Sequence, residues 1–167
     1  MIFVTTGTSQ YDFQRMLEST QKCLSVINEP YELVVQYGST KVLPNFENII
    51  VKTEFLSRDE LVHYYETSDF IFSHCGIGSI YNSLAYNRPT VLIPRLAKYN
   101  EFSDDHQLQI AKEVSRNESL HVLSENFEEN GNIEKFKNFY EFGTNFQKCE
   151  VDVVNGAFVK RVSEFLS

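Results

Sequence analysis

Several residue types are scarce in this 167-residue chain, which has no tryptophan, two methionines, four prolines and seven glycines. So little proline and glycine excludes collagen-like and proline/glycine-rich low-complexity chains. The three cysteines, Cys23, Cys75 and Cys149, are an odd number and show no C-x-x-C spacing. This pattern argues against a disulfide framework or a zinc site and favours a reducing compartment.

Positive charge and long apolar runs are also scarce. The chain has 15 Lys and Arg against 23 Asp and Glu, a formal net charge of -8. Because this excess repels a polyanionic backbone, we expect no nucleic-acid partner. No stretch approaches the roughly 18 apolar residues of a membrane-spanning helix, and residues 1–4 lack the basic flank of a signal peptide. The sequence therefore predicts a cytoplasmic globular protein.

Strand-like and helix-like segments alternate over the first 123 residues. Apolar runs predict strands, whereas amphipathic spacing and a capping box at Ser57 and Glu60 predict helices. Such alternation, with continuously apolar strands, indicates an α/β fold with a Rossmann-like, doubly wound parallel sheet, whose ligands lie at the carboxyl ends of the strands. Strands are expected at residues 1–6, 31–37, 48–55, 69–73, 90–93 and 120–123, and helices at 12–26, 57–67, 77–85 and 106–114.

The C-terminal part carries weaker patterns. Residues 125–148 are polar with interspersed aromatics, and residues 153–165 have the spacing of an amphipathic terminal helix. Two interpretations of the tail are open: packing on the domain's own core, or docking on another protein. Both interpretations concern the tail aromatics Phe136, Phe139, Tyr140, Phe142, Phe146, Phe158 and Phe165.

No linker divides the chain, so one domain over residues 1–167 is expected.

A glycine-bearing turn between a predicted strand and helix is the best local signal for a ligand site. It reads Gly76-Ile77-Gly78-Ser79, and a helix that begins here offers unpaired amides to a diphosphate. The same pattern also occurs in simple packing turns. Tyr81 stands where a dinucleotide-binding fingerprint has its third glycine. A nicotinamide cofactor is therefore disfavoured.

Two further polar turns are expected at the same edge of the sheet. The turn at residues 7–9 can be a tight connection in which Ser9 or Asp12 caps the next helix. The turn at residues 104–107 carries two adjacent aspartates, one of which can be a cap, and we expect no metal there. His74, at a strand end, can be catalytic or structural.

Residues 73–111, SHCGIGSIYNSLAYNRPTVLIPRLAKYNEFSDDHQLQIA, resemble the donor-binding core of the glycosyltransferase family 28 C-terminal domain. The resemblance rests on an SH-x-G-x-G-S turn, an R-P-x-V-x-I-P strand and a D-x-H-Q helix start, in that order. The opening IFVTTGTSQYDFQRMLE resembles the small single-domain branch. That branch includes PssE-type exopolysaccharide transferases and the soluble subunit of the eukaryotic enzyme that adds the second GlcNAc to dolichol diphosphate.

This resemblance implies the C-terminal half of a GT-B glycosyltransferase, with the other half on a membrane-anchored partner subunit. It implies inverting transfer of a hexose, with galactose expected, from a UDP-sugar to a polyprenyl-diphosphate-linked saccharide in exopolysaccharide or capsule synthesis. It implies no metal or other cofactor, and a location at the inner face of the membrane through the partner. A composition rich in Asn, Lys, Phe and Tyr favours a bacterial source. The alternatives are a non-catalytic subunit that raises a partner's activity and, less favoured, a stand-alone nucleotide-sugar enzyme such as an epimerase.

The family's functional positions can be carried over onto this sequence. Asn82 stands where the family usually has an acidic residue that binds the ribose, which removes a charge-assisted hydrogen bond. His74 and Asp12 are the candidates for the base that takes the acceptor's proton, although the partner can also supply it. The implied donor-binding residues are Gly7 and Thr8 at the cleft, Gly76, Ile77, Gly78 and Ser79 at the diphosphate, Asn82 at the ribose, and His106 and Gln107 at the sugar.

Overall fold

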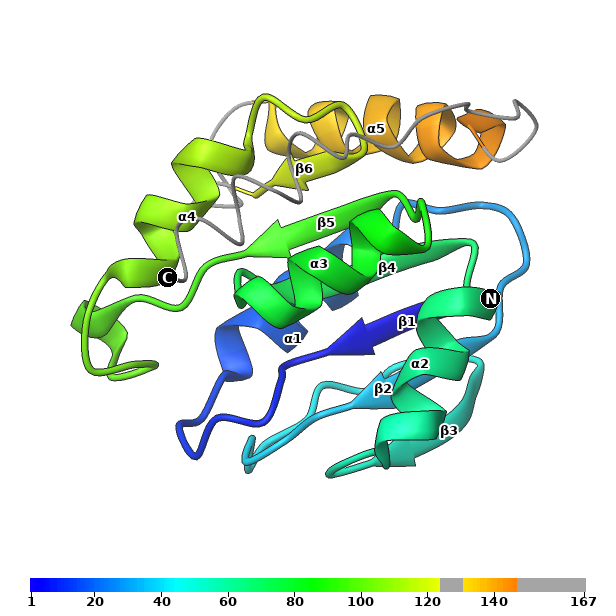
Figure 1. Cartoon of the computed structure of the whole chain (residues 1–167). Coiled ribbons are helices and arrows are strands. Elements are labelled where there is room, and N and C mark those ends of the chain that lie inside the picture. The colour runs from blue at the N-terminus through cyan, green and yellow to red at the C-terminus, as the bar shows by residue number, and fades with distance from the viewer. Residues whose placement is uncertain (124–130, 147–167) are drawn as a thin grey trace.

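The computed structural model describes residues 1–123 and 131–146, which form a six-stranded parallel sheet between helices (Figure 1). The strand order is β3-β2-β1-β4-β5-β6, the order of a doubly wound Rossmann sheet. The predicted fold class is confirmed. The strands are β1 (Ile2–Thr5), β2 (Leu33–Gln36), β3 (Ile49–Thr53), β4 (Phe70–His74), β5 (Thr90–Ile93) and β6 (Leu120–Val122). The helices are α1 (Gln14–Leu24), α2 (Arg58–Thr67), α3 (Ile77–Ala85), η1 (Ala97–Tyr99), α4 (His106–Val114) and α5 (Asn132–Phe146).

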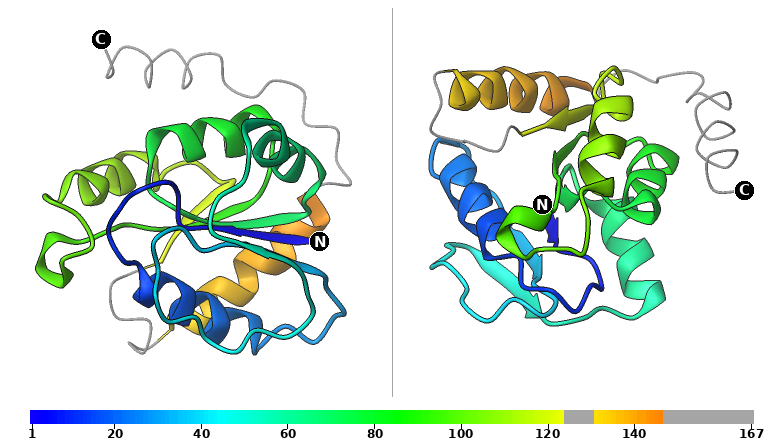
Figure 2. Two further views of the ribbon diagram at one scale, coloured as in Figure 1. Left: turned by 90° about the horizontal axis from the view of Figure 1, so that it is seen from below. Right: turned by 90° about the vertical axis from the view of Figure 1, so that its left-hand side faces the viewer.

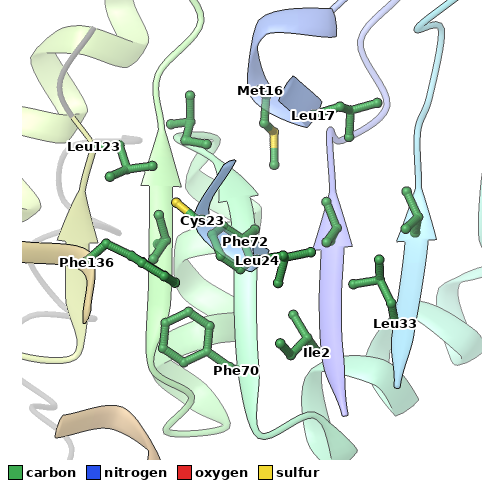
Figure 3. Packing of buried hydrophobic residues seen from close by; sticks show 14 of the residues in the cluster. Ile2, Met16, Leu17, Cys23, Leu24, Leu33, Phe70, Phe72, Leu123 and Phe136 are labelled. Atoms are coloured by element: carbon green, nitrogen blue, oxygen red, sulfur yellow. The ribbon is translucent and has the colours of Figure 1, made fainter. Parts of the chain in front are cut away.

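Helices cover both faces of the sheet (Figure 2). On one face α1 and α5 pack against alternate residues of β1, β2, β4 and β5, in the large apolar cluster of Figure 3. On the other face Tyr65 of α2 packs against Phe3 and Val34, and α3 and α4 bury Ile80 and Ile110. Because both faces are covered, the inner strands β1, β2, β4 and β5 are buried along almost their whole length, whereas the edge strand β3 alternates.

The strand order reverses between β1 and β4, which are direct neighbours in register, with Thr5 opposite Ser73. In doubly wound sheets the crevice for a ligand opens at this point, beyond the carboxyl ends of the two strands. Thr5 leads into the turn at Gly7, and Ser73 leads into the turn at Gly76. The two glycine turns predicted from the sequence are thus neighbours.

The capping box predicted at the start of α2 is confirmed. The Ser57 hydroxyl accepts a hydrogen bond from the Glu60 amide at 3.3 Å, and the Glu60 carboxylate accepts one from the Ser57 amide at 2.8 Å. Two amides of the first turn therefore have partners without help from the rest of the fold.

Helix α5 lies in the part of the tail for which the sequence gives no clear period. Phe136 is 0% exposed and contacts Phe72, with ring centroids 5.8 Å apart. Tyr140 lies 5.1 Å from Phe70 by the same measure. These tail aromatics belong to the core, so the docking interpretation does not apply to them. The side chain of Phe146 and residues 153–165 lie outside the described residues.

Within residues 1–123 and 131–146, no helix combines the length and the apolar character that crossing a bilayer requires.

Candidate functional site

Three connections meet at the carboxyl edge of the sheet. They are the β1–α1 loop at residues 6–13, the β4–α3 turn at residues 74–76 and the β5–α4 loop at residues 94–105. Side chains join them directly, because His74 lies against Gly7 and Arg95 donates to the carbonyl of Thr6. The convergence of the three turns expected from the sequence is therefore observed.

The His74 imidazole fills the space between the first two turns. A Cβ at Gly7 would lie 2.4 Å from His74 Cε1, and a Cβ at Gly76 would lie 2.2 Å from His74 Nε2. Gly7 also has a φ of +79°, which L side chains rarely adopt. Both turns need glycine because the histidine ring occupies the place of any side chain. This explains two of the family-motif glycines without reference to a ligand.

His74 is held in its neutral form. Burial and, to a smaller extent, the charge of Arg95 lower the pKa of its imidazole to about 4, although a hydrogen bond with the Thr5 backbone opposes them. The Nδ1 atom lies 3.5 Å from the Ser79 hydroxyl oxygen. An imidazole with this pKa is a weak base at neutral pH, because a general base works best with a pKa near the operating pH.

The start of α3 is the part of the site suited to bind a phosphate. Gly76 is the N-cap, and in the described part of the chain no side chain caps this helix. The amides of the first turn therefore point out of the helix end, where the helix dipole also favours negative charge. A Cβ at Gly78 would meet nothing within 4 Å, and the residue is exposed. Within residues 1–123 and 131–146, no contact requires glycine at position 78, in contrast to Gly7 and Gly76.

Ile77 and Asn82 complete the predicted positions on α3. Ile77 packs against the apolar cluster beneath the helix, so its side chain anchors the turn and its amide faces outward at the helix start. Asn82 is half-buried and lies three residues after Ser79, hence on the same side of the helix.

Arg95, which the sequence did not single out, holds the β5–α4 loop against the β1–α1 loop. Its side chain is 1% exposed and donates hydrogen bonds to the carbonyls of Thr6, Tyr11, Asp12 and Glu101 at 2.9, 3.1, 3.3 and 2.9 Å. Burial lowers the pKa of the guanidinium to about 10, which leaves it charged at neutral pH. The two loops therefore form one unit around a buried cation.

A second arginine strengthens this connection. Arg15 of α1 forms a two-point ion pair with Glu101, with nitrogen–oxygen distances of 2.8 and 2.6 Å, and also donates to the Pro94 carbonyl. Glu101 is 4% exposed, and its carboxylate accepts from the Leu96 amide. No local pattern predicts a pair 86 residues apart.

The residues expected at the sugar and at the base are placed as follows. Gln107 is 7% exposed, and its carbonyl oxygen accepts a hydrogen bond from the Arg95 amide at 3.1 Å. His106 and Thr8 are exposed at the same edge. The Asp12 carboxylate accepts from the amides of Gln14 and Lys41 at 2.9 and 3.4 Å. The expected helix-cap role of Asp12 is wrong, because Phe13 is the N-cap of α1 and no described side chain caps this helix.

The two aspartates before α4 also have backbone partners. Asp104 accepts a hydrogen bond from the His106 amide, and Asp105 accepts one from the Ala97 amide, both at 2.9 Å. Each carboxylate therefore closes a loop locally. Asp105 occupies the N-cap position of α4, but its carboxylate bonds the loop, and no described side chain caps this helix.

Comparisons with known proteins place the chain among its relatives. The chain is 25% identical over 119 residues to the UDP-N-acetylglucosamine transferase subunit ALG13 of Mus musculus, and 26% identical over 120 residues to that of Homo sapiens. These matches cover 68% and 69% of this chain but 10% of each relative. The chain thus spans about a tenth of the length of the curated relatives it matches.

Two solved structures share the fold. Acinetobacter baumannii MurG superposes with a TM-score of 0.60 and 17% identity, over 87% of this chain and 41% of MurG. The glycosyltransferase of kitacinnamycin superposes with a TM-score of 0.52 and 16% identity, over 87% of this chain and 38% of the other. Residues 1–135 match the family model itself, and the chain therefore belongs to the glycosyltransferase family 28 C-terminal domain family.

Proposed function

We propose that this protein is the nucleotide-sugar-binding subunit of a two-component inverting glycosyltransferase. It binds a UDP-sugar and, with a membrane-anchored partner, transfers a hexose to a polyprenyl-diphosphate-linked saccharide. Galactose transfer in bacterial exopolysaccharide or capsule synthesis is the specific reaction we favour, from the resemblance to the PssE-type branch.

The start of α3 is the observation that supports this proposal most directly. Outward-pointing amides, an exposed Gly78 with open space above it and the neighbouring Gly7 turn form a place for a diphosphate at the switch point of the sheet. Negative charge grows on the leaving UDP during transfer. Fixed amides at Gly78 and Ser79 stabilise that charge without reorganisation, as in other preorganised anion sites.

The proposed partner rests on the resemblance to the two-component branch. The described residues form one sheet, and 87% of the chain superposes on 41% of MurG. In this proposal the acceptor side of the GT-B cleft comes from a second polypeptide. The name of the ALG13 relative, a transferase subunit, supports the same assignment. His74 and Asp12 are the bases this chain offers to the acceptor hydroxyl, and the partner is the other source.

Titration calorimetry of the full chain with UDP, ATP and NAD tests the nucleotide assignment. We expect UDP to bind with the highest affinity, because the turn lacks the third glycine of the dinucleotide fingerprint. A preference for ATP or NAD would refute the proposal. Sugar transfer measured with and without the membrane partner then distinguishes a catalytic from an accessory subunit.

The accessory alternative, a donor-binding subunit without catalysis, draws on Asn82. An amide at the ribose position binds without the charge that roughly doubles the strength of a carboxylate hydrogen bond. Asn82→Asp should tighten UDP binding by about 1 kcal/mol, unless the diphosphate lies close enough to repel it. Asn82→Ala is the matched control and should weaken binding. Transfer gained with Asn82→Asp would support the accessory reading, and unchanged affinity would place the ribose elsewhere.

A further inference from the structure

Tyr65 of α2 carries a buried hydroxyl that the fold itself does not explain. Its side chain is 0% exposed, and its ring packs edge-on against Phe3 with centroids 5.4 Å apart. Among the described residues, its hydroxyl oxygen has no hydrogen bond of good geometry, although the hydroxyls of Ser79 and Ser73 lie beside it. A buried polar group without a well-formed hydrogen bond destabilises a fold, whereas phenylalanine would fill the same space without that cost. The free protein therefore leaves this hydroxyl with hydrogen-bonding capacity that its own packing does not use well.

The Tyr65 hydroxyl faces the start of α3. The hydroxyls of Ser79 and Ser73 lie beside it, close enough to lower the pKa of the phenol, although burial has the larger effect and raises it. The phenol is therefore protonated at neutral pH and available as a donor. Ser73 already donates its hydrogen to the His74 carbonyl at 3.1 Å. Ser79 is therefore the neighbour whose hydroxyl can both accept from Tyr65 and donate to a ligand.

Ser79 lies between Tyr65 and the proposed ligand position. It is half-buried in the first turn of α3, and its contact of 3.5 Å with His74 Nδ1 is at the limit of a hydrogen bond. A serine hydroxyl has one hydrogen to donate and two lone pairs that accept. If it accepts from Tyr65, its hydrogen is directed away from the core, toward the open side of the helix start.

We propose that Tyr65 is a positioning residue for the anionic ligand: its hydroxyl donates to Ser79, and Ser79 then donates to a phosphate oxygen above Gly78. The inference rests on the proposed function and deepens it, because it names the residue behind the diphosphate site. Chained hydrogen bonds polarise one another, and a bond to a charged acceptor is stronger than a neutral one, so the chain is completed when the anion binds. In the free protein the Tyr65 hydroxyl lies beside Ser79 without a hydrogen bond of good geometry.

Tyr65→Phe separates this role from a structural one. Removal of an unpaired buried hydroxyl should leave the melting temperature of the free protein unchanged or raise it. The same change should weaken UDP and inorganic pyrophosphate binding about three- to tenfold, as loss of one supporting hydrogen bond does. Tyr64→Phe on the same helix is the matched control, since Tyr64 also packs beside Phe3, and it should leave both affinities unchanged. A lower melting temperature with unchanged affinity would overturn the proposal.

A double-mutant cycle with Ser79→Ala tests the order of the chain. If Tyr65 acts through Ser79, then Tyr65→Phe has no further effect on affinity in the Ser79→Ala background. Additive losses would show that Tyr65 does not act through Ser79 and would overturn the proposal. Binding by the wild type separates the proposed function from the role of Tyr65. If the wild type binds pyrophosphate but does not prefer UDP, the proposed function is refuted, and the double-mutant cycle can still be measured with pyrophosphate. Failure of the wild type to bind either probe refutes both.

Discussion

The guanidinium carbon of Arg95 lies 4.3 Å from the centre of the Phe13 ring, so a buried cation stacks on the residue that precedes α1. This stacking fixes the guanidinium while its nitrogens donate to four backbone carbonyls of two loops. A fork of fixed donors suits this task better than the single ammonium of lysine. The β1–α1 and β5–α4 loops are therefore positioned by one side chain.

Arg95→Met should reduce the free energy of unfolding by at least about 3 kcal/mol, because it leaves buried carbonyls unpaired and leaves Glu101 without one of the nearby positive charges. Arg95→Lys should recover part of this loss, since an ammonium can reach some of the carbonyls. Urea unfolding measures both. A loss below 1 kcal/mol for Arg95→Met would mean that the loops hold together without the cation.

The low pKa of His74 predicts a loss of stability in mild acid. The imidazole has a pKa of about 4 in the folded chain, against roughly 6.5 when unfolded. Above pH 6.5 both states are neutral, and between pH 6.5 and 4 the unfolded state takes up the proton first. The free energy of unfolding should therefore fall over this window by up to about 3 kcal/mol from His74 alone.

Thermal or urea unfolding of the wild type and of His74→Asn between pH 7 and pH 4.5 checks this expectation. The variant should lose less stability on acidification, and the exposed His63, changed to Asn, is the control that should behave as wild type. His121 also has a lowered pKa but contributes equally to all three proteins. Equal acid sensitivity of His74→Asn and wild type would contradict the assignment.

The sequence predicts the elements that local chemistry defines. The bounds of β5 and α4 agree with the prediction, because Pro89 and Pro94 flank the strand and the helix has regular apolar spacing. Helix α5 was not predicted, since its polar and apolar residues show no clear period and its position depends on contact with Phe70 and Phe72.

The candidate site, too, is predictable from the sequence only where local chemistry defines it. The glycine turns are visible in the sequence because a strand and a helix meet there. The reason for two of the glycines is not visible, because it lies in the His74 ring packed between them. The contacts of Arg95 with residues 6–12, and the pair of Arg15 with Glu101, join segments over 80 residues apart. Only the folded chain brings them together.

The packing of α5 predicts different costs for two of its aromatics. Phe136 is 0% exposed between Phe70 and Phe72, so Phe136→Ala should cost about 3–5 kcal/mol of stability. Phe142 is 40% exposed, and Phe142→Ala should cost well under half as much. Denaturant unfolding of the two variants gives the comparison. Equal, small losses would show that α5 does not form part of the core.

The two glycines of the β4–α3 turn predict opposite effects of the same substitution. Gly76→Ala must displace the His74 ring, since the new Cβ would lie 2.2 Å from Nε2, and should cost about 1–3 kcal/mol of stability. Gly78→Ala meets nothing within 4 Å, and its place in the first turn of α3 makes it neutral or stabilising by up to about 1 kcal/mol.

Gly78→Ala should impair UDP binding even though it does not reduce stability. If a diphosphate approaches the helix start there, the added methyl group occupies its path, and Gly78→Ala should weaken UDP binding by at least about fivefold while the protein stays fully folded. Circular dichroism and calorimetric titration of the same preparation measure the two properties together. Unchanged UDP affinity in Gly78→Ala would move the diphosphate away from α3, because the open space above this glycine is the feature that the fold itself does not use.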